Sequence, residues 1–257
     1  MQNADVLDLL PTWAVFCATL LLVLLSLEIG FLIGRFRNRR SDVEKEAPVG
    51  SMVGATLALL AFMLGFAFSM AADRYDARRH VLLDEVNSIG TTYLRAGLFP
   101  QQRDAIRELL REYVDIRLEA ARTGKINEGI RRSEELQAKL WAQAEALGQQ
   151  HPDSITVGLF IQSLNETIDL HTKRVTASLR SRVPDAIWLT LFAVAAVSFS
   201  AMGYHAGLSR THRSIAALAV AFVFASVIGM IVALDRPTNG ILRISQQGLI
   251  DLRQSMR

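Results

Sequence analysis

Two phenylalanines one helical turn apart, Phe62 and Phe66, lie in the middle of a long apolar run. Residues four apart share a face of a helix, and Ala58 continues that face one turn earlier. If the helix lines a symmetric pore, rings of these side chains make a narrow apolar constriction that gates by dewetting. The alternative is that the two rings pack against lipid or neighbouring helices, as aromatic residues on membrane helices usually do. The three residues are therefore a candidate pore neck.

The same helix continues from apolar into charged sequence, because no proline follows Phe66 until Pro100. One helix is therefore expected to leave the bilayer and extend into water. In a pore, its basic residues would lie next to the neck and attract anions; they are Arg74, Arg78 and Arg79. Ordinary ion pairing along the helix, such as Asp76 with Arg79, is the alternative.

Further along this helix, His80 is followed by Asp84 and Glu85, residue types that bind cations. One histidine with two acids and no second histidine is a weak metal signature, so no metal is expected. The chain also lacks a glycine-rich phosphate loop, a nucleophile elbow, a paired-histidine zinc motif and a dinucleotide fingerprint. We therefore expect no cofactor and no enzymatic activity.

Glu28 is the one ionisable residue well inside an apolar run. A carboxylate in a bilayer is costly, so Glu28 is a functional candidate that faces an aqueous path or pairs with a neighbouring helix. Alternatively, it reaches the interface near Arg35, about 10 Å away along the helix, or it is protonated. Both interpretations stay open at this point.

The densest polar run of the later sequence contains Asn165, Asp169 and Lys173. Their spacing of four places them on one face of a helix. We expect that face to contact the charged part of the long helix and to support it structurally.

The composition of the chain indicates a membrane protein. Of the 257 residues 51% are hydrophobic, and the apolar residues fall in long runs. The net charge is only +3 and basic residues are interleaved with acidic ones, which argues against nucleic acid as a partner. The N-terminal residues before the first apolar run contain no Lys or Arg, so that run is expected to remain in the mature protein.

The sequence predicts an all-α integral membrane protein with four transmembrane helices and a helical extramembrane bundle inserted between the second and third spans. The expected parts are a first transmembrane pair in 1–72 (spans about 12–34 and 50–72), a bundle in 73–183, a second pair in 184–234 and an amphipathic tail in 235–257. The first two spans exceed the roughly 20 apolar residues that a bilayer requires. Breakers at Pro100, Gly124 and residues 151–153 divide the bundle into antiparallel helices.

Small residues recur at a spacing of four in the second span. The two series are Gly50, Gly54 and Ala58, and Ala61, Gly65 and Ser69. Such spacing lines one helix face with small side chains and allows close helix packing.

Four spans bring both termini and the bundle to the same side of the membrane, which we take to be the inner, or plasma, membrane. Under the positive-inside rule the first connector is basic enough to be cytoplasmic, which leaves the bundle outside. Its basic residues are Arg35, Arg37, Arg39, Arg40 and Lys45. The membrane-proximal ends of the bundle are also basic and favour the opposite orientation, so the sequence does not assign the side.

Three blocks of the sequence resemble one bacterial membrane family, the bestrophin-like proteins, formerly a domain of unknown function. The blocks are LGFAFSMAADRYDARRHVLLDEVNSIGTTYLR, LNETIDLHTKRVTASLRSRVP and LDRPTNG, and the resemblance extends from the second span to the tail. Bestrophins themselves are more distantly similar; they are pentameric anion channels with four membrane helices and a helical cytosolic part. The pattern of their second helix is matched by Phe62, Gly65, Phe66, Arg74 and Tyr75.

The resemblance implies that Phe62 and Phe66 form a hydrophobic neck, with Ala58 in place of a larger residue and one ring correspondingly wider. It also implies a homo-oligomer, a pentamer, in the lipid bilayer that passes anions or small solutes, and it implies a cytosolic bundle. The acidic calcium-binding run of animal bestrophins has no counterpart after Leu234, so calcium gating is not expected.

Two hypotheses of different classes follow from the sequence. The first is an oligomeric, anion-preferring ion channel whose neck comes from the second span. The second is a transmembrane sensor or scaffold whose bundle binds a ligand or a protein partner without transport. The tail after Pro237 is too short for an output module, which counts against a sensor unless a partner supplies the output.

Overall fold

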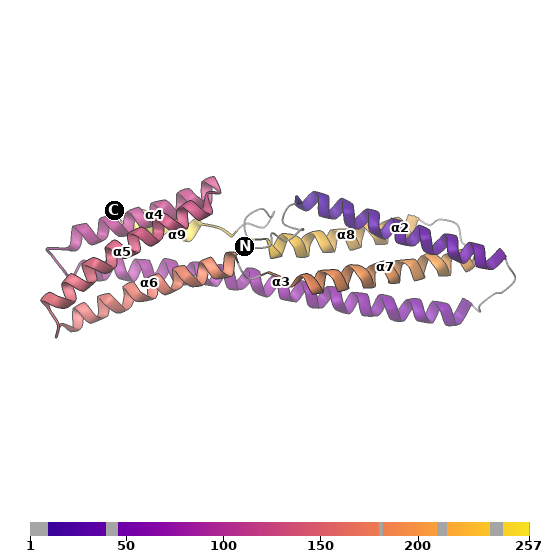
Figure 1. Cartoon of the computed structure of the whole chain (residues 1–257), viewed down its shortest axis with the longest axis horizontal. Coiled ribbons are helices and arrows are strands. Elements are labelled where there is room, and N and C mark those ends of the chain that lie inside the picture. The colour runs from indigo at the N-terminus through magenta and orange to yellow at the C-terminus, as the bar shows by residue number, and fades with distance from the viewer. Residues whose placement is uncertain (1–9, 40–45, 180–181, 210–214, 237–243, 257) are drawn as a thin grey trace. The chain divides into compact units, whose positions relative to one another are not determined.

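The computed structural model describes residues 10–39, 46–179, 182–209, 215–236 and 244–256, which are almost entirely helical (Figure 1). The helices are α2 (Thr12–Arg39), α3 (Glu46–Ala96), α4 (Arg103–Thr123), α5 (Ile126–Gln150), α6 (Ile155–Leu179), α7 (Asp185–Leu208), α8 (Ile215–Asp235) and α9 (Gln247–Ser255). No strand occurs in these ranges. The prediction of an all-α fold is confirmed.

Four helices, α2, α3, α7 and α8, are long and apolar enough to cross a membrane. The second of them, α3, has 51 residues and continues from its apolar part into charged sequence without a break. The predicted order, two spans followed by a helical bundle and two more spans, is therefore confirmed. The chain is a multi-pass membrane protein.

The chain forms two compact units. The membrane unit contains the described residues of 1–75 and 182–242, which are α2, the first part of α3, α7 and α8. The bundle unit contains those of 76–181 and 243–257, which are the rest of α3, α4, α5, α6 and α9. The last helix, which the sequence assigns to a separate tail, thus belongs with the bundle.

The core of the membrane unit is apolar and draws on all four of its helices. Val23 of α2, Leu60 of α3 and Leu191 of α7 are almost fully buried. Phe199 of α7 and Phe224 of α8 meet edge to face, with ring centroids 5.1 Å apart. Because lipid is as apolar as these side chains, close packing rather than escape from water holds such helices together.

The closest packing in the membrane unit joins the backbones of α2 and α7 through glycines. A Cβ atom added at Gly203 would overlap the carbonyl oxygen of Leu27, and one added at Gly30 would overlap that of Ser200. By contrast, a Cβ added at Gly54 or Gly65 of α3 would meet nothing within 4 Å. The small-residue face predicted for the second span is therefore open at these two glycines within one chain, whereas the tight contact lies between the first and third spans.

The bundle unit packs an apolar core between the second part of α3 and the helices α4, α5 and α6 (Figure 1). Fully buried residues come from each of them and include Ile89, Leu110, Leu140 and Leu164. Gly124 ends α4 in the left-handed conformation, with φ at +75°, and its N–H donates to the carbonyl of Ala120. A residue with a Cβ atom is strained there, which explains the glycine.

The short helix α9 closes the bundle unit by packing on α3 and α4. Leu249 and Met256 are fully buried. The hydroxyl of Tyr93 donates to the carbonyl of Met256 at 2.9 Å, and Arg253 forms a two-bond ion pair with Asp115 at 2.7 and 3.0 Å. The ion pair is largely exposed and contributes little, so burial of the two apolar side chains is the main attachment.

The glycine contact between α2 and α7 predicts a position-specific effect of alanine. Gly203→Ala should lower stability by about 1–3 kcal/mol, because the new methyl group forces the two backbones apart. Gly229→Ala in α8 is the matched control, since its Cβ would meet nothing within 4 Å and both substitutions gain the same helix propensity. Thermal unfolding in detergent measures the difference, and equal melting temperatures would contradict the packing argument.

Candidate functional site

The face of α3 that carries the predicted neck is uncovered in the membrane unit. Phe62 and Phe66 are 72% and 59% exposed, and Ala58 is exposed as well. The other side of the same stretch is buried, with Leu60 and Ala67 at 3% and 1% exposure. The three neck residues therefore share one open face, on which lipid, a solute path or another copy of the chain must lie.

The three arginines expected to attract anions are placed differently from one another. Arg79 is exposed, whereas Arg78 is buried at 2% exposure. Arg74 is half-buried and donates to the carbonyl of Met70, one turn earlier, at 3.2 Å. Helical spacing puts none of the three on the face of the phenylalanines.

The charged residue in register with the two phenylalanines is acidic. Asp73 follows Phe66 by seven residues, which is two helical turns, and it is exposed. Within the described chain its carboxylate takes part in no ion pair or hydrogen bond. The open face of α3 thus leads from an apolar neck to an unpaired carboxylate.

The residues considered for a metal site do not come together. His80 and Asp84 are exposed on the surface of the bundle unit, while Glu85 is fully buried. No group of three or more histidine, cysteine or acidic side chains suited to a metal is found among the residues that the structure describes.

Glu28 is half-buried on α2 and has an interaction partner in the structure. Its role as an intramembrane ionisable group stays a prediction.

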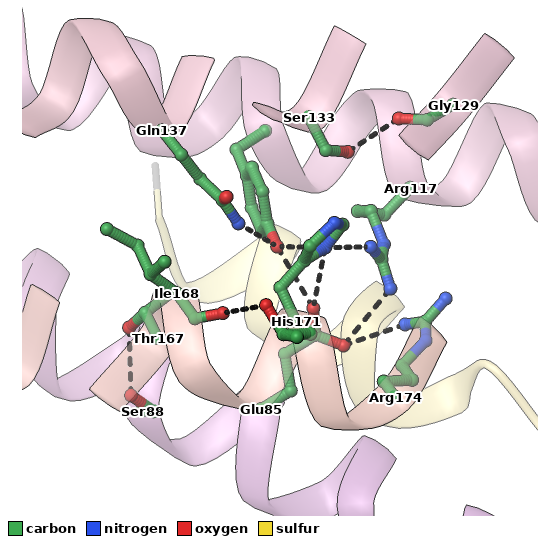
Figure 2. Close-up of polar contacts among 12 residues, drawn as sticks. Glu85, Ser88, Arg117, Gly129, Ser133, Gln137, Thr167, Ile168, His171 and Arg174 are labelled. Atoms are coloured by element: carbon green, nitrogen blue, oxygen red, sulfur yellow. Dashed lines mark hydrogen bonds and ion pairs between the residues drawn. The ribbon is translucent and has the colours of Figure 1, made fainter. Parts of the chain in front are cut away.

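A buried polar centre joins α3, α4 and α6 in the bundle unit (Figure 2). It consists of Glu85, Tyr113, Arg117, His171 and Arg174. Oε2 of Glu85 accepts hydrogen bonds from Arg174 at 2.8 Å and from Arg117 at 3.2 Å. Oε1 accepts from the hydroxyl of Tyr113 at 3.0 Å, and Nη1 of Arg117 lies 2.6 Å from Nδ1 of His171. The carboxylate of Glu85 in α3 is therefore hydrogen-bonded to residues of both α4 and α6.

The protonation states of the polar centre follow from burial and charge. Burial raises the pKa of Glu85, but Arg117 and Arg174 together outweigh burial and hold that pKa below its usual value. Burial, reinforced by Arg117, lowers the pKa of His171 to about 4. Burial and the neighbouring Glu85 raise the pKa of Tyr113. At neutral pH the centre thus contains one carboxylate, two guanidinium groups and a neutral imidazole.

Hydroxyl groups extend the polar contact along the seam between α3 and α6. The hydroxyls of Ser88 and Thr167 lie 2.8 Å apart, and those of Thr92 and Thr167 lie 3.2 Å apart. Ser163 bonds the carbonyl of Phe160, one turn earlier in its own helix, at 2.9 Å. All of these hydroxyl residues are buried, so the seam is polar although the surrounding core is apolar.

The prediction for the face of α6 that contacts α3 is wrong. Asn165, Asp169 and Lys173 are exposed, and Asn165 donates to Asp169 at 3.3 Å on the surface. The contacting face is instead the one that carries Thr167 and His171. Spacing alone shows which residues share a face but not which face is buried, and here the most strongly charged face lies in solvent.

Tyr113 and Arg117 are functional candidates that are not predicted from the sequence. A signal was present, because Arg117 stands four residues after Tyr113 on the buried stripe of α4. A charged residue on an otherwise apolar stripe must have a buried partner, although the sequence does not tell which acidic residue it is.

A comparison with protein-family models decides the classification. The model of the bestrophin-like domain matches residues 20–249. The chain belongs to the bestrophin-like family. A comparison of this bestrophin-like chain with curated proteins gives no match.

Solved structures share the bestrophin-like fold. A variant of a bacterial bestrophin homologue from Klebsiella pneumoniae aligns with a TM-score of 0.70 at 16% identity, over 94% of this chain and 97% of its own. The same homologue, phased with zinc, aligns with a TM-score of 0.66 at 17% identity, over 93% and 95%. At these identities the similarity establishes the fold.

The neutral, buried His171 predicts a loss of stability in mild acid. Its pKa is about 4 in the folded state and about 6.5 when unfolded, so between these values only the unfolded chain takes up the proton. The contribution of neutral His171 to stability is therefore fully present above pH 6.5. The free energy of unfolding should fall by about 3 kcal/mol as the pH drops to 4. Glu85 also makes the fold less stable in acid, but only below its ordinary pKa of 4.5, where the carboxylate of the unfolded chain is protonated first.

His171→Asn removes the titrating group and keeps an oxygen that accepts from Arg117. Between pH 7.5 and 4.5 the melting temperature should fall more steeply for the unmodified protein than for this variant. His80→Asn, at an exposed histidine of α3, is the control and should behave like the unmodified protein. Identical slopes for all three proteins would show that His171 does not titrate as described.

Proposed function

We propose that this bestrophin-like chain assembles as a homo-pentamer around a central pore lined by α3, through which small ions pass down their gradient. The observation that supports the proposal most is the open face of α3, on which Phe62 and Phe66 are 72% and 59% exposed in a single chain. Two large aromatic side chains that a single chain leaves exposed on one helix face need a further surrounding. A ring of five such faces supplies one.

In the proposed pentamer, Phe62 and Phe66 form two stacked apolar rings and Ala58 a wider third one. Such a constriction loses its water when narrow and conducts when widened, which makes it a gate that needs no charged group. The surrounding bilayer covers the remaining apolar surface of the four spans.

The charge next to the neck favours cations in this proposal. An anion preference was expected from Arg74, Arg78 and Arg79, but none of them shares the face of the phenylalanines. Asp73 does share it and is exposed and unpaired within the described chain. Rings of carboxylates next to a constriction are typical of cation channels, so we propose that the pore prefers cations.

The inner, or plasma, membrane is the proposed location, with both termini and the bundle on one side. A reporter fused to the C-terminus assigns that side.

Planar bilayers that contain the purified protein should conduct, and the neck should control the current. Phe62→Ala combined with Phe66→Ala removes both apolar rings, and a barrier lower by about 1.4 kcal/mol raises the current about tenfold. Phe68→Ala is the matched control, because Phe68 is a partly exposed phenylalanine of the same helix on another face. Silence of both the unmodified and the double-variant protein at high reconstitution density would overturn the pore.

The mass of the detergent complex provides an independent check on the assembly. A complex of one or two chains leaves no central axis for a ring of phenylalanines and favours the sensor or scaffold hypothesis instead.

Asp73→Asn should shift the ion preference of the pore. Under a KCl gradient the current through the unmodified protein should reverse near the potassium equilibrium potential. The current through the variant should reverse closer to zero, because the ring of carboxylates is lost. Asp153→Asn, at an exposed acid in the turn after α5, leaves the reversal potential unchanged. Reversal of the unmodified protein near the chloride equilibrium potential would instead support the role expected of the arginines.

A further inference from the structure

Nε2 of His171 is buried and has no hydrogen-bond partner in the part of the chain that the structure describes. The contacts of the other ring nitrogen, Nδ1, show whether Nε2 is a hydrogen-bond donor or an acceptor. Nδ1 lies 2.6 Å from Nη1 of Arg117, and a guanidinium group only donates. Nδ1 therefore accepts, and the neutral ring carries its hydrogen on Nε2. The unmatched group is an N–H donor.

An N–H donor in this position calls for an acceptor. The whole residue is only 2% exposed, so bulk water does not solvate the donor. Buried donors in proteins almost always have a partner, which is either protein, ordered water or an ion. In this bundle the described protein atoms do not supply it.

The charges around His171 distinguish between water and an ion. Glu85 brings one negative charge, while Arg117 and Arg174 bring two positive charges, and all three are in direct contact. The acidic residues near them in sequence are all exposed to solvent: Asp84, Asp115, Glu119 and Asp169. Asp115 and Glu119 are moreover paired with Arg253 and Arg132. One positive charge is therefore left without a buried counter-charge. A water molecule would satisfy the N–H group only, whereas an anion satisfies both requirements.

We propose that the polar centre of the bundle unit binds one small monovalent anion, of the size of a halide, at the Nε2–H group of His171. Tyr113, Arg117 and His171 are each at least 95% buried, and enclosure of this kind favours a small ion over an organic acid. Arg174 is the member closest to water, with 20% of its side chain exposed, and it marks the side from which the ion enters. The polar centre contains none of the residues of the proposed neck, so its test does not depend on conduction.

Thermal unfolding of the full-length protein in detergent tests the site. Bromide replaces gluconate at constant ionic strength, so that only the nature of the anion changes. The melting temperature of the unmodified protein should rise and saturate, by about 3–5 °C at a tenfold excess over the dissociation constant. His80→Asn should respond in the same way, whereas His171→Asn, which lacks the Nε2–H donor, should not respond. Equal responses in both variants, or no response in the unmodified protein, would overturn the proposal.

Crystals of the unmodified protein grown in bromide provide a second measurement that does not depend on a variant. Anomalous scattering from a bromide ion within hydrogen-bond distance of Nε2 of His171 supports the site. Water density without an anomalous signal at that position would overturn it, even if His171→Asn does not fold.

Discussion

The backbone hydrogen bonds of α3 run without interruption from Glu46 to Ala96, and the rest of the structure has to accommodate this single helix. In a bilayer every backbone N–H and C=O group needs an internal partner, which a helix supplies. The side chains that pack against α3 change along its length. In the membrane unit its buried face is apolar, with Leu60, Ala67 and Ala71, whereas in the bundle unit it includes Glu85, Ser88 and Thr92.

The polar centre around Glu85 determines how the bundle helices are aligned. A buried ion pair adds little to stability by itself, because apolar side chains of the same volume often do as well. Its contribution here is alignment, because only one register of α3, α4 and α6 brings Glu85 to both Arg117 and Arg174. An apolar seam would tolerate a shift of one helix along another more readily. The hydroxyl groups of Ser88 and Thr167 extend the same restriction along the seam.

The fold class and the spans were predictable from the sequence because apolar runs and helix breakers are local signals. The same holds for the shared face of Phe62 and Phe66, since spacing of four has one meaning in a helix. The partners of Glu85 were not predictable, because Arg117 and Arg174 are distant in sequence and the sequence contains many alternative ion pairs. The contact between α2 and α7 was missed for a related reason: small residues occur in several spans, and sequence does not show which two of them approach.

Membership in the bestrophin-like family and the open face of α3 support each other, although each has a different basis. The family match rests on sequence along residues 20–249. The open face rests on which side chains a single chain leaves uncovered. Both agree with the oligomeric channel that is proposed above.

The glycine contact between α2 and α7 also restricts how the membrane unit can change shape. Backbones that touch at Gly30 and Gly203 have no side chains between them to rearrange, so these two helices move as one rigid body. The buried contacts of α3 come from Val53 and Leu60 as well as from the methyl groups of Ala67 and Ala71. Phe62 and Phe66 lie on the uncovered face of α3, so their side chains can change orientation while the contact between α2 and α7 stays intact.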